Sequence, residues 1–115
     1  MVIGAPMYNF SIPSQLKAWI DRIVVAGKTF RYTASGPQGL AGAKRVIVAA
    51  AKGGVYAANA PGEFVESYLR YVLGFIGITD VTFVSAEGLA ISAEQRRASI
   101  DSALAAIAGE LPRAA

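Results

Sequence analysis

The sequence predicts an α/β fold of three layers, α/β/α, in which an open parallel sheet is covered by helices on both faces. Segments with strand character alternate with segments of helical periodicity along the 115 residues, an order that is typical of parallel sheets. The run from Arg45 to Ala51 is continuously apolar after its first residue, which indicates a strand buried on both faces. The length fits a single domain over residues 1–115.

The first half of the chain contains one predicted strand, one helix and one short extended segment. The strand covers Val2 to Ala5 and stops at Pro6, and residues 7–10 follow as a loop. The helix is expected to begin between Ser11 and Ser14, with Pro13 in its first turn, where a missing N–H costs nothing. Its apolar face comprises Leu16, Trp19, Ile20, Ile23 and Val24. Gly27 is expected just beyond its end, residues 29–33 alternate as a short strand, and residues 35–39 indicate a loop.

The second half continues the alternation of strands and helices. The strand over residues 45–51 ends at the turn Lys52-Gly53-Gly54, and a helix is expected from residues 60–62 to about Ile76, where Gly77 stops it. Residues 80–86 form another strand, and Ser92 with Glu94 and Gln95 fits the capping box of a last helix. That helix is expected to be closed by Leu111-Pro112 and to turn inward the side chains of Ile100, Ala103, Leu104 and Ile107.

Composition narrows the chemistry that the chain can perform. It has no Cys and no His, which excludes disulfides, thiolate metal sites and Cys nucleophiles and removes the commonest general base. Its net charge is +3 without any block of basic residues, so nucleic acid is not a predicted partner. The apolar runs are far shorter than the roughly 18 residues of a membrane-spanning helix. No signal peptide is visible, so we expect a cytoplasmic protein without membrane association.

Ligands of open α/β sheets bind outside the carboxyl ends of the strands, and three loops qualify: residues 6–11, 51–56 and 87–90. The first contains Met7, Tyr8 and Phe10 together with the amide of Asn9. Large apolar groups in a surface loop cost free energy unless they cover something, so this loop favours a planar aromatic ligand. The alternative is that these side chains pack beneath the following helix.

Two further groups of residues are candidates for a binding site. Gly53 and Gly54 after Lys52 would let backbone N–H groups approach a phosphate or a heterocycle edge closely, although Gly-Gly after a strand is often only a turn, and both dinucleotide fingerprints are absent. The aromatic residues around Phe30-Arg31-Tyr32 and Gly74-Phe75 line either a pocket, a subunit contact or the core. The carboxylates are scattered along the chain. We interpret them as residues on solvated faces, at helix caps or at strand ends, and they are Asp21, Glu63, Glu66, Asp80 and Glu87.

The stretch Ala5-Pro6-Met7-Tyr8-Asn9-Phe10-Ser11-Ile12-Pro13-Ser14-Gln15-Leu16-Lys17 resembles the FMN-dependent NADH-azoreductase family, in the flavodoxin-like quinone reductase group. Further matches follow in the same order: residues 26–33, Gly36-Pro37 with Gly39-Leu40, residues 52–54 and residues 73–78. Each match alone is weak, and together they are specific. The resemblance implies a flavodoxin-like fold and a homodimer with FMN near the subunit boundary.

The resemblance also implies roles for particular residues. FMN would be held by two groups, one around the isoalloxazine ring and one at its polar edge: Pro6, Met7, Tyr8, Asn9 and Phe10, and then Ala51, Lys52, Gly53 and Gly54. The substrate pocket would be shaped by Asn9, Tyr32 and Phe75, with Phe75 reaching across the dimer. NADH or NADPH would deliver a hydride, and a quinone or azo compound would then accept two electrons in a ping-pong reaction. The cofactor carries such chemistry, which agrees with the absence of His and Cys.

The resemblance covers only the C-terminal portion of a family member. The family's first strand, its Ser-rich phosphate loop and its second strand have no counterpart in these residues. We therefore expect the chain to be the C-terminal part of a longer protein and to bind FMN poorly by itself. Two alternatives stay open: a truncated non-catalytic remnant, and a flavodoxin-like binding or electron-transfer module, which the net charge of +3 does not favour.

Overall fold

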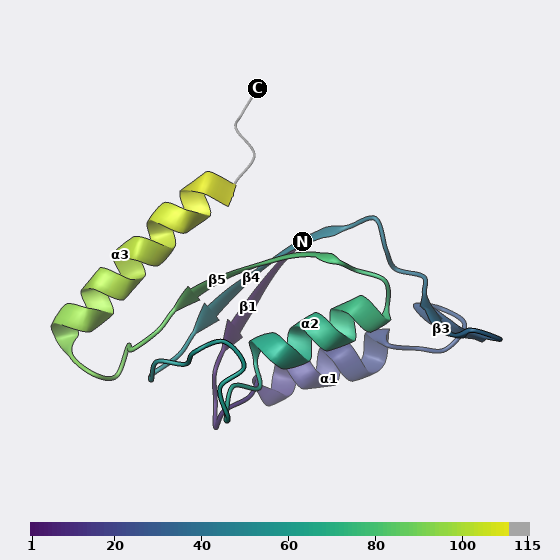
Figure 1. Cartoon of the computed structure of the whole chain (residues 1–115), viewed down its shortest axis with the longest axis horizontal. Coiled ribbons are helices and arrows are strands. Elements are labelled where there is room, and N and C mark those ends of the chain that lie inside the picture. The colour runs from purple at the N-terminus through teal and green to yellow at the C-terminus, as the bar shows by residue number, and fades with distance from the viewer. Residues whose placement is uncertain (111–115) are drawn as a thin grey trace.

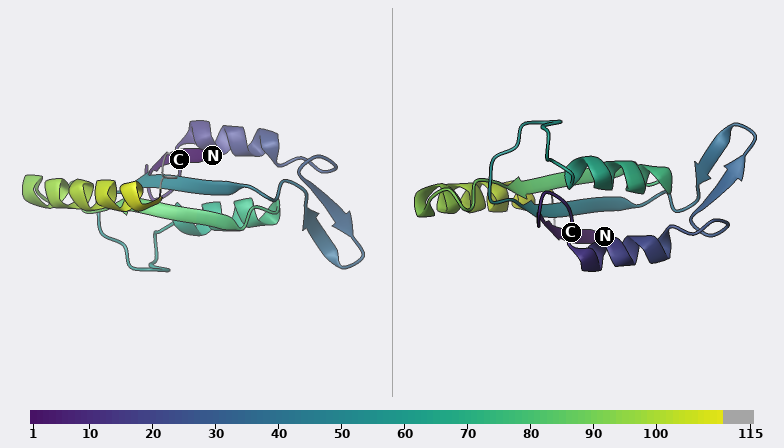
Figure 2. Two further views of the ribbon diagram at one scale, coloured as in Figure 1. Left: turned by 90° about the horizontal axis from the view of Figure 1, so that it is seen from above. Right: turned by 90° about the horizontal axis from the view of Figure 1, so that it is seen from below.

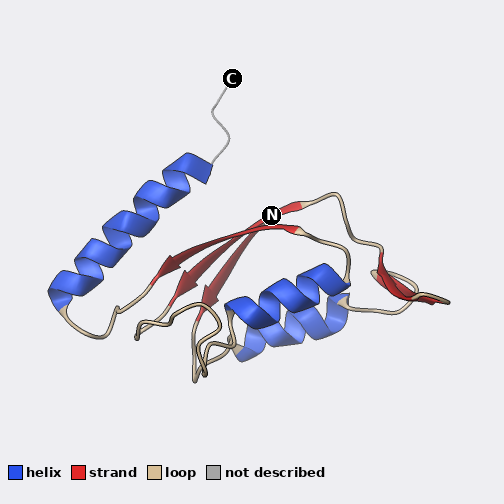
Figure 3. Ribbon diagram, in the orientation of Figure 1, coloured by secondary structure: helices blue, strands red, loops and turns tan. Residues whose placement is uncertain are grey.

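The computed structural model describes residues 1–110, so the predicted closure at Leu111-Pro112 lies outside the described residues. The elements, shown in Figures 1 and 3, are β1 (Val2–Pro6), α1 (Ser14–Ile23), β2 (Phe30–Thr33), β3 (Gly36–Gly39), β4 (Arg45–Ala51), α2 (Glu66–Phe75), β5 (Asp80–Ala86) and α3 (Ala93–Glu110). The bounds of β4 and β5 are those that the sequence predicts: β4 is apolar after Arg45 and ends before Lys52, and β5 lies between Asp80 and the loop that begins at Glu87.

The main sheet is parallel and has the strand order β1-β4-β5. Helices α1 and α2 lie side by side under one face, and α3 lies on the other side (Figures 1 and 2). Alternate strand residues point toward α1 and α2 and form the core with side chains from those helices: Ile3, Ala5, Val46, Val48 and Ala50 with Ile20, Leu69 and Leu73. The predicted parallel sheet with helices on both sides is confirmed.

Helix α3 covers only part of its side of the sheet. It lies against β5, where Val84 is buried, whereas Val2 on β1 is 69% exposed. In α3 the side chains of residues 100, 103 and 107 are half-buried, but Leu104 is 58% exposed. The prediction that Leu104 turns inward is wrong, because α3 packs mainly against the edge strand β5 and meets β4 through the ion pair of Glu110 with Arg45 (Figure 1).

Three predicted boundaries differ from the structure. Helix α2 begins at Glu66 instead of residues 60–62, because Gly62 has φ +87, far from the helical value, and the Glu63 side chain binds the first N–H groups of the helix. Helix α1 ends at Ile23, and Gly27 (φ +81) instead forms the turn in which its N–H donates to Phe30 O, 2.7 Å away. Residues 36–39 form β3, which pairs with β2 in an antiparallel hairpin. In α1, Trp19 belongs to the predicted apolar face but is 38% exposed.

Two predicted helix ends are confirmed. Gly77 (φ +97) follows the C-terminus of α2, and the Ile78 N–H donates to Leu73 O at 2.9 Å, as in a glycine-terminated helix. At the start of α3, Ser92 Oγ accepts the Gln95 N–H at 3.1 Å. No helix within residues 1–110 combines the length and apolarity that are needed to cross a membrane.

Candidate functional site

The carboxyl ends of the three parallel strands bring the predicted loops to one edge of the sheet. Pro6 pairs with Ala51 in register, and the Met7 N–H donates to Ala51 O at 2.8 Å. Ala51 in turn pairs with Ala86, and the Lys52 N–H donates to Ala86 O at 2.9 Å. The loops that follow β1, β4 and β5 are therefore neighbours.

The loop after β1 is a tight turn that displays two aromatic side chains. Tyr8 and Ser11 exchange two backbone hydrogen bonds of 2.9 and 3.1 Å, and Asn9 (φ 48) and Phe10 (φ 72) between them are both left-handed. Tyr8 and Phe10 are 61% and 56% exposed, whereas Met7 packs against the core. The alternative prediction, that these side chains pack inside the fold, is therefore confirmed for Met7 and wrong for Tyr8 and Phe10.

A second segment supports this turn. The Phe64 N–H donates to Phe10 O at 3.0 Å, and a Cβ at Gly62 would lie 3.4 Å from the Phe10 ring. Phe64 is itself 56% exposed. We call the three exposed rings of Tyr8, Phe10 and Phe64 the aromatic patch. Exposed apolar patches, unlike single exposed side chains, mark binding surfaces, and the backbone bond from Phe64 to Phe10 brings two of these residues together.

The turn after β4 presents backbone donors at the same edge of the sheet as the turn that carries Tyr8 and Phe10. Its carbonyls at Lys52, Gly53 and Gly54 accept hydrogen bonds of 3.2, 3.0 and 2.9 Å from the N–H groups of residues 89, 90 and 88. Within residues 1–110, the N–H groups of Gly53 and Gly54 donate no hydrogen bond. Free N–H groups in an exposed turn can bind the polar edge of a ligand and stabilise negative charge on it.

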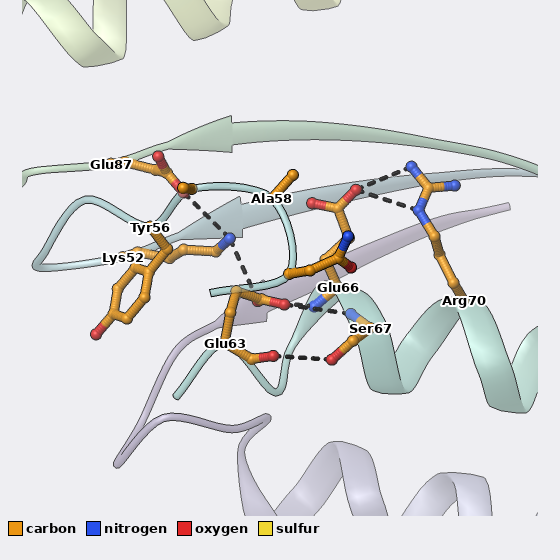
Figure 4. A pocket seen from close by; sticks show the side chains of 10 residues that line it. Lys52, Tyr56, Ala58, Glu63, Glu66, Ser67, Arg70 and Glu87 are labelled. Carbon is orange, nitrogen blue, oxygen red and sulfur yellow. Dashed lines mark hydrogen bonds and ion pairs between the residues drawn. The ribbon is translucent and has the colours of Figure 1, made fainter. Parts of the chain in front are cut away.

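The side chain of Lys52 is buried instead of facing a ligand. It is 2% exposed, and its Nζ lies 3.3 Å from Glu63 Oε1 and 3.2 Å from Glu87 Oε1 (Figure 4). Only the backbone of Lys52 is therefore available at this edge. Sequence reasoning missed the ion pairs, although Val46, Val48, Ala50 and Lys52 share the period-two spacing that places them on the helix-covered face.

Glu63 binds the N-terminus of α2 as well as Lys52. Its Oε1 accepts the Val65 and Glu66 N–H groups at 3.1 and 2.9 Å, and its Oε2 accepts the Ser67 N–H at 3.2 Å. Burial raises the pKa of Glu63, but the backbone hydrogen bonds and the charge of Lys52 together outweigh it and hold the pKa below its ordinary value of 4.5. The interpretation of Glu63 as a helix cap is confirmed, and that of a solvated residue is wrong.

Glu63→Gln is expected to lower the free energy of unfolding at pH 7 by about 1 to 2 kcal/mol. Because the pKa of Glu63 is lower in the folded than in the unfolded chain, its stabilisation is present above pH 4.5 and is lost as the pH falls through the folded value. Urea denaturation should therefore show the variant and the unaltered chain converging below pH 4.5. Glu94→Gln, in the exposed first turn of α3, is the matched control, and a gap that persists at acid pH contradicts the prediction.

Tyr32 and Phe75, the other two residues of the predicted substrate pocket, lie at the opposite end of the sheet from Asn9. Phe75 ends α2, whose ten residues span about 15 Å from its start at the carboxyl edge, and the β2–β3 hairpin lies beside that end of α2 (Figure 1). Phe30 is buried, 4.7 Å from Phe75 and 5.4 Å from Tyr32 between ring centroids, while Tyr32 is 74% exposed. The structure thus joins Tyr32 with Phe75 through Phe30, but does not bring Asn9 to them within one chain.

The fold and this loop-built edge define a flavodoxin-like α/β protein. A family model described as flavodoxin-like fold matches residues 1–111, and the chain belongs to this family. It is 64% identical over 109 residues to FMN-dependent NADH:quinone oxidoreductase 2 of Bradyrhizobium diazoefficiens, covering 92% of this chain and 54% of the relative. It is 58% identical over 115 residues to FMN-dependent NADH:quinone oxidoreductase 1 of Pseudomonas putida, covering 100% and 57%.

Solved structures show the same likeness. The crystal structure of azoreductase AzrA superposes with a TM-score of 0.80 at 36% identity and covers 96% of this chain and 56% of that one. An FMN-dependent NADH-azoreductase from Bacillus anthracis in complex with FMN gives 0.79 at 32% identity, with the same coverage. The chain spans about half the length of the curated relatives it matches.

Proposed function

We propose that the chain forms the ring-binding part of an FMN-dependent NAD(P)H oxidoreductase that reduces quinones and azo compounds by two-electron ping-pong hydride transfer. The observation that carries this proposal is the joining of two turns at one sheet edge. The turn of residues 7–10 follows β1, the turn with the free N–H groups of Gly53 and Gly54 follows β4, and the Met7 N–H bonds to Ala51 O where these two strands end. Relatives named for this reaction support the proposal.

The residues at this edge fit an isoalloxazine ring. Pro6, Met7, Tyr8, Asn9 and Phe10 would contact its faces, and the backbone of Ala51, Lys52, Gly53 and Gly54 would face its polar edge. When bound, FMN supplies hydride acceptance from NADH or NADPH and its delivery to a quinone or azo substrate. The aromatic patch orients the ring and excludes water, and the N–H groups of Gly53 and Gly54 stabilise negative charge on its reduced form.

The substrate pocket needs a second copy of the chain. Asn9 lies at the carboxyl edge, whereas Tyr32 and Phe75 lie about one α2 length away, so the three residues can line one pocket only across a subunit boundary. We therefore propose a homodimer in which Phe75 and the exposed Tyr32 of one protomer approach the ring site of the other. Mixing Asn9→Ala chains with Phe75→Ala chains is expected to restore part of the activity of the loaded enzyme through hybrid dimers, which a pocket within one chain does not allow.

Titration with flavins tests the proposed function directly. Residues 1–110 supply ring contacts, so we expect saturable but weak quenching of flavin fluorescence, with similar Kd for FMN and for riboflavin, which has no phosphate. FMN binding that is micromolar or tighter, and much tighter than that of riboflavin, would show a phosphate site and contradict this expectation. No saturable binding of either flavin would favour a non-catalytic remnant. Flavin binding without quinone-dependent NADH oxidation would favour an electron-transfer module.

Phe10→Gly is expected to weaken flavin binding while leaving the free energy of unfolding within about 0.5 kcal/mol of that of the unaltered chain. Glycine adopts the left-handed φ of 72° without the cost of roughly 1 kcal/mol that a side chain pays there, but the freer unfolded chain offsets about 0.5 to 1 kcal/mol of that gain. The same change removes one ring of the aromatic patch. Thermal unfolding and riboflavin titration measure the two effects, and Phe64→Ala is the control that removes a patch ring without relieving a left-handed residue. A variant that binds riboflavin as tightly as the unaltered chain contradicts the prediction.

A further inference from the structure

We propose that Lys52 is a positioning residue of the ring site, because its ammonium group, shared between Glu63 and Glu87, fixes the Gly53–Gly54 turn whose N–H groups face the ligand. This inference rests on the proposed function and deepens it. Lys52 itself touches no ligand, since its side chain is 2% exposed.

The ammonium group connects three segments that meet at the carboxyl edge. Lys52 follows β4 directly, Glu63 lies just before α2 and caps it, and Glu87 follows β5 directly. The Nζ atom lies within 3.3 Å of one carboxylate and 3.2 Å of the other, and the Tyr56 ring lies 5.9 Å from it. Figure 4 shows Lys52 pointing between Glu63 and Glu87. A shift of any one segment therefore lengthens an ion pair that is largely shielded from water.

The same residue is tied to the glycine turn through the backbone. The segment 88–90, which donates hydrogen bonds to the carbonyls of residues 52–54, directly follows Glu87. The Glu87 N–H also donates to Ser99 Oγ at 2.9 Å, which holds this segment to α3. The Lys52–Glu87 ion pair and the backbone hydrogen bonds of residues 88–90 therefore both attach segment 87–90 to the Gly53–Gly54 turn. Without the ion pair, the Gly53–Gly54 turn would be held to segment 88–90 by its three backbone hydrogen bonds alone.

The surroundings of Lys52 leave room for a larger cation. A cavity of about 220 Å³ borders its side chain and is also lined by Tyr56, Asn59, Ser67 and Arg70. A guanidinium group can enter this space and still reach both carboxylates. Lys52→Arg should therefore keep the positioning function, whereas Lys52→Met, which has similar length and no charge, should lose it.

The test combines amide NMR spectra of the chain with riboflavin titration. In Lys52→Met the signals of the Gly53 and Gly54 amides are expected to shift or broaden, and the riboflavin Kd is expected to rise about tenfold. Glu87→Gln, which alters a half-buried carboxylate and keeps the cap of α2, is expected to give the same changes in a folded chain. Lys52→Arg should restore both readouts, and Lys28→Met at an exposed lysine should change neither.

Two results would overturn the proposal. One is a folded Glu87→Gln chain whose Gly53 and Gly54 signals and riboflavin Kd equal those of the unaltered chain. The other is a Lys52→Arg chain as defective as Lys52→Met, which would show that the charge is not the active feature. If the unaltered chain binds no flavin, the proposed function fails, and the glycine amide signals still show separately whether Lys52 fixes the turn.

Discussion

Lys52→Met is expected to lower the free energy of unfolding at pH 7 by about 3 to 5 kcal/mol. The change removes the only cation within ion-pair distance of the Glu63 carboxylate among residues 1–110, and Glu63 is 9% exposed. A buried carboxylate that loses its cationic partner retains the cost of its desolvation, and only the backbone N–H groups at the start of α2 remain to offset that cost for Glu63. Urea denaturation followed by the fluorescence of Trp19, the single Trp of the chain, measures the loss.

The double variant Lys52→Met with Glu63→Gln distinguishes the stability lost with the ion pair from the stability lost with side-chain packing. Glu63→Gln removes the charge that Lys52→Met leaves unpaired, so the double variant is expected to lose less than the sum of the single losses, by about 1 kcal/mol or more. Lys28→Met provides the same substitution at an exposed position and is expected to change stability by no more than about 0.5 kcal/mol. Strictly additive losses would show that Lys52 and Glu63 do not stabilise each other.

The location of the site could be predicted from the sequence, because parallel strands end at one edge of the sheet. Residues 45–51 are identifiable as a strand from their apolar run, and the turns that follow β1 and β4 are therefore expected to be neighbours. The bond from Met7 to Ala51 agrees with that reasoning. Local sequence patterns are enough to place a loop when the strands on both sides of it can be recognised from their buried residues.

The ion pairs and the true start of α2 could not be predicted, because both depend on contacts distant in the chain. Helical spacing extends back through Phe64 and Val65, yet the backbone leaves the helix before Glu66. Glu63 uses its side chain to cap the helix, and the position of Lys52 from β4 holds it there. Nothing in the spacing of Lys52, Glu63 and Glu87 indicates that the fold brings them together.

The hairpin was missed for a related reason. Gly36, Pro37 and Gly39 are residues that disfavour strands, so local composition indicates a loop. Pairing of β3 with β2 is nevertheless supported from outside the hairpin, because Gly39 lies directly against the backbone at the end of α2. This contact places Phe30 on Phe75 and leaves Tyr32 exposed.

Gly39→Ala is accordingly expected to lower the free energy of unfolding by about 3 kcal/mol and to displace the hairpin from α2. A Cβ at this position would overlap the backbone of Ile76 and Gly77, atoms that cannot move without opening the end of α2. Gly74→Ala is the matched control: its Cβ would meet nothing within 4 Å, and alanine inside a helix should stabilise it by about 0.5 to 1 kcal/mol.

The same pair of variants distinguishes the two ends of the proposed site. Gly39→Ala leaves residues 6–10 and 51–54 in place, so the chain that stays folded should bind riboflavin as the unaltered chain does. The hairpin carries Tyr32 and contacts Phe75, so on the proposed function quinone reduction by the proposed dimer should fall as the hairpin moves away from the pocket. Ring-current shifts of Phe30 and Phe75 report the displacement directly. Unchanged shifts and stability in Gly39→Ala would mean that the hairpin does not depend on its contact with α2, and the proposed pocket would then lack its support.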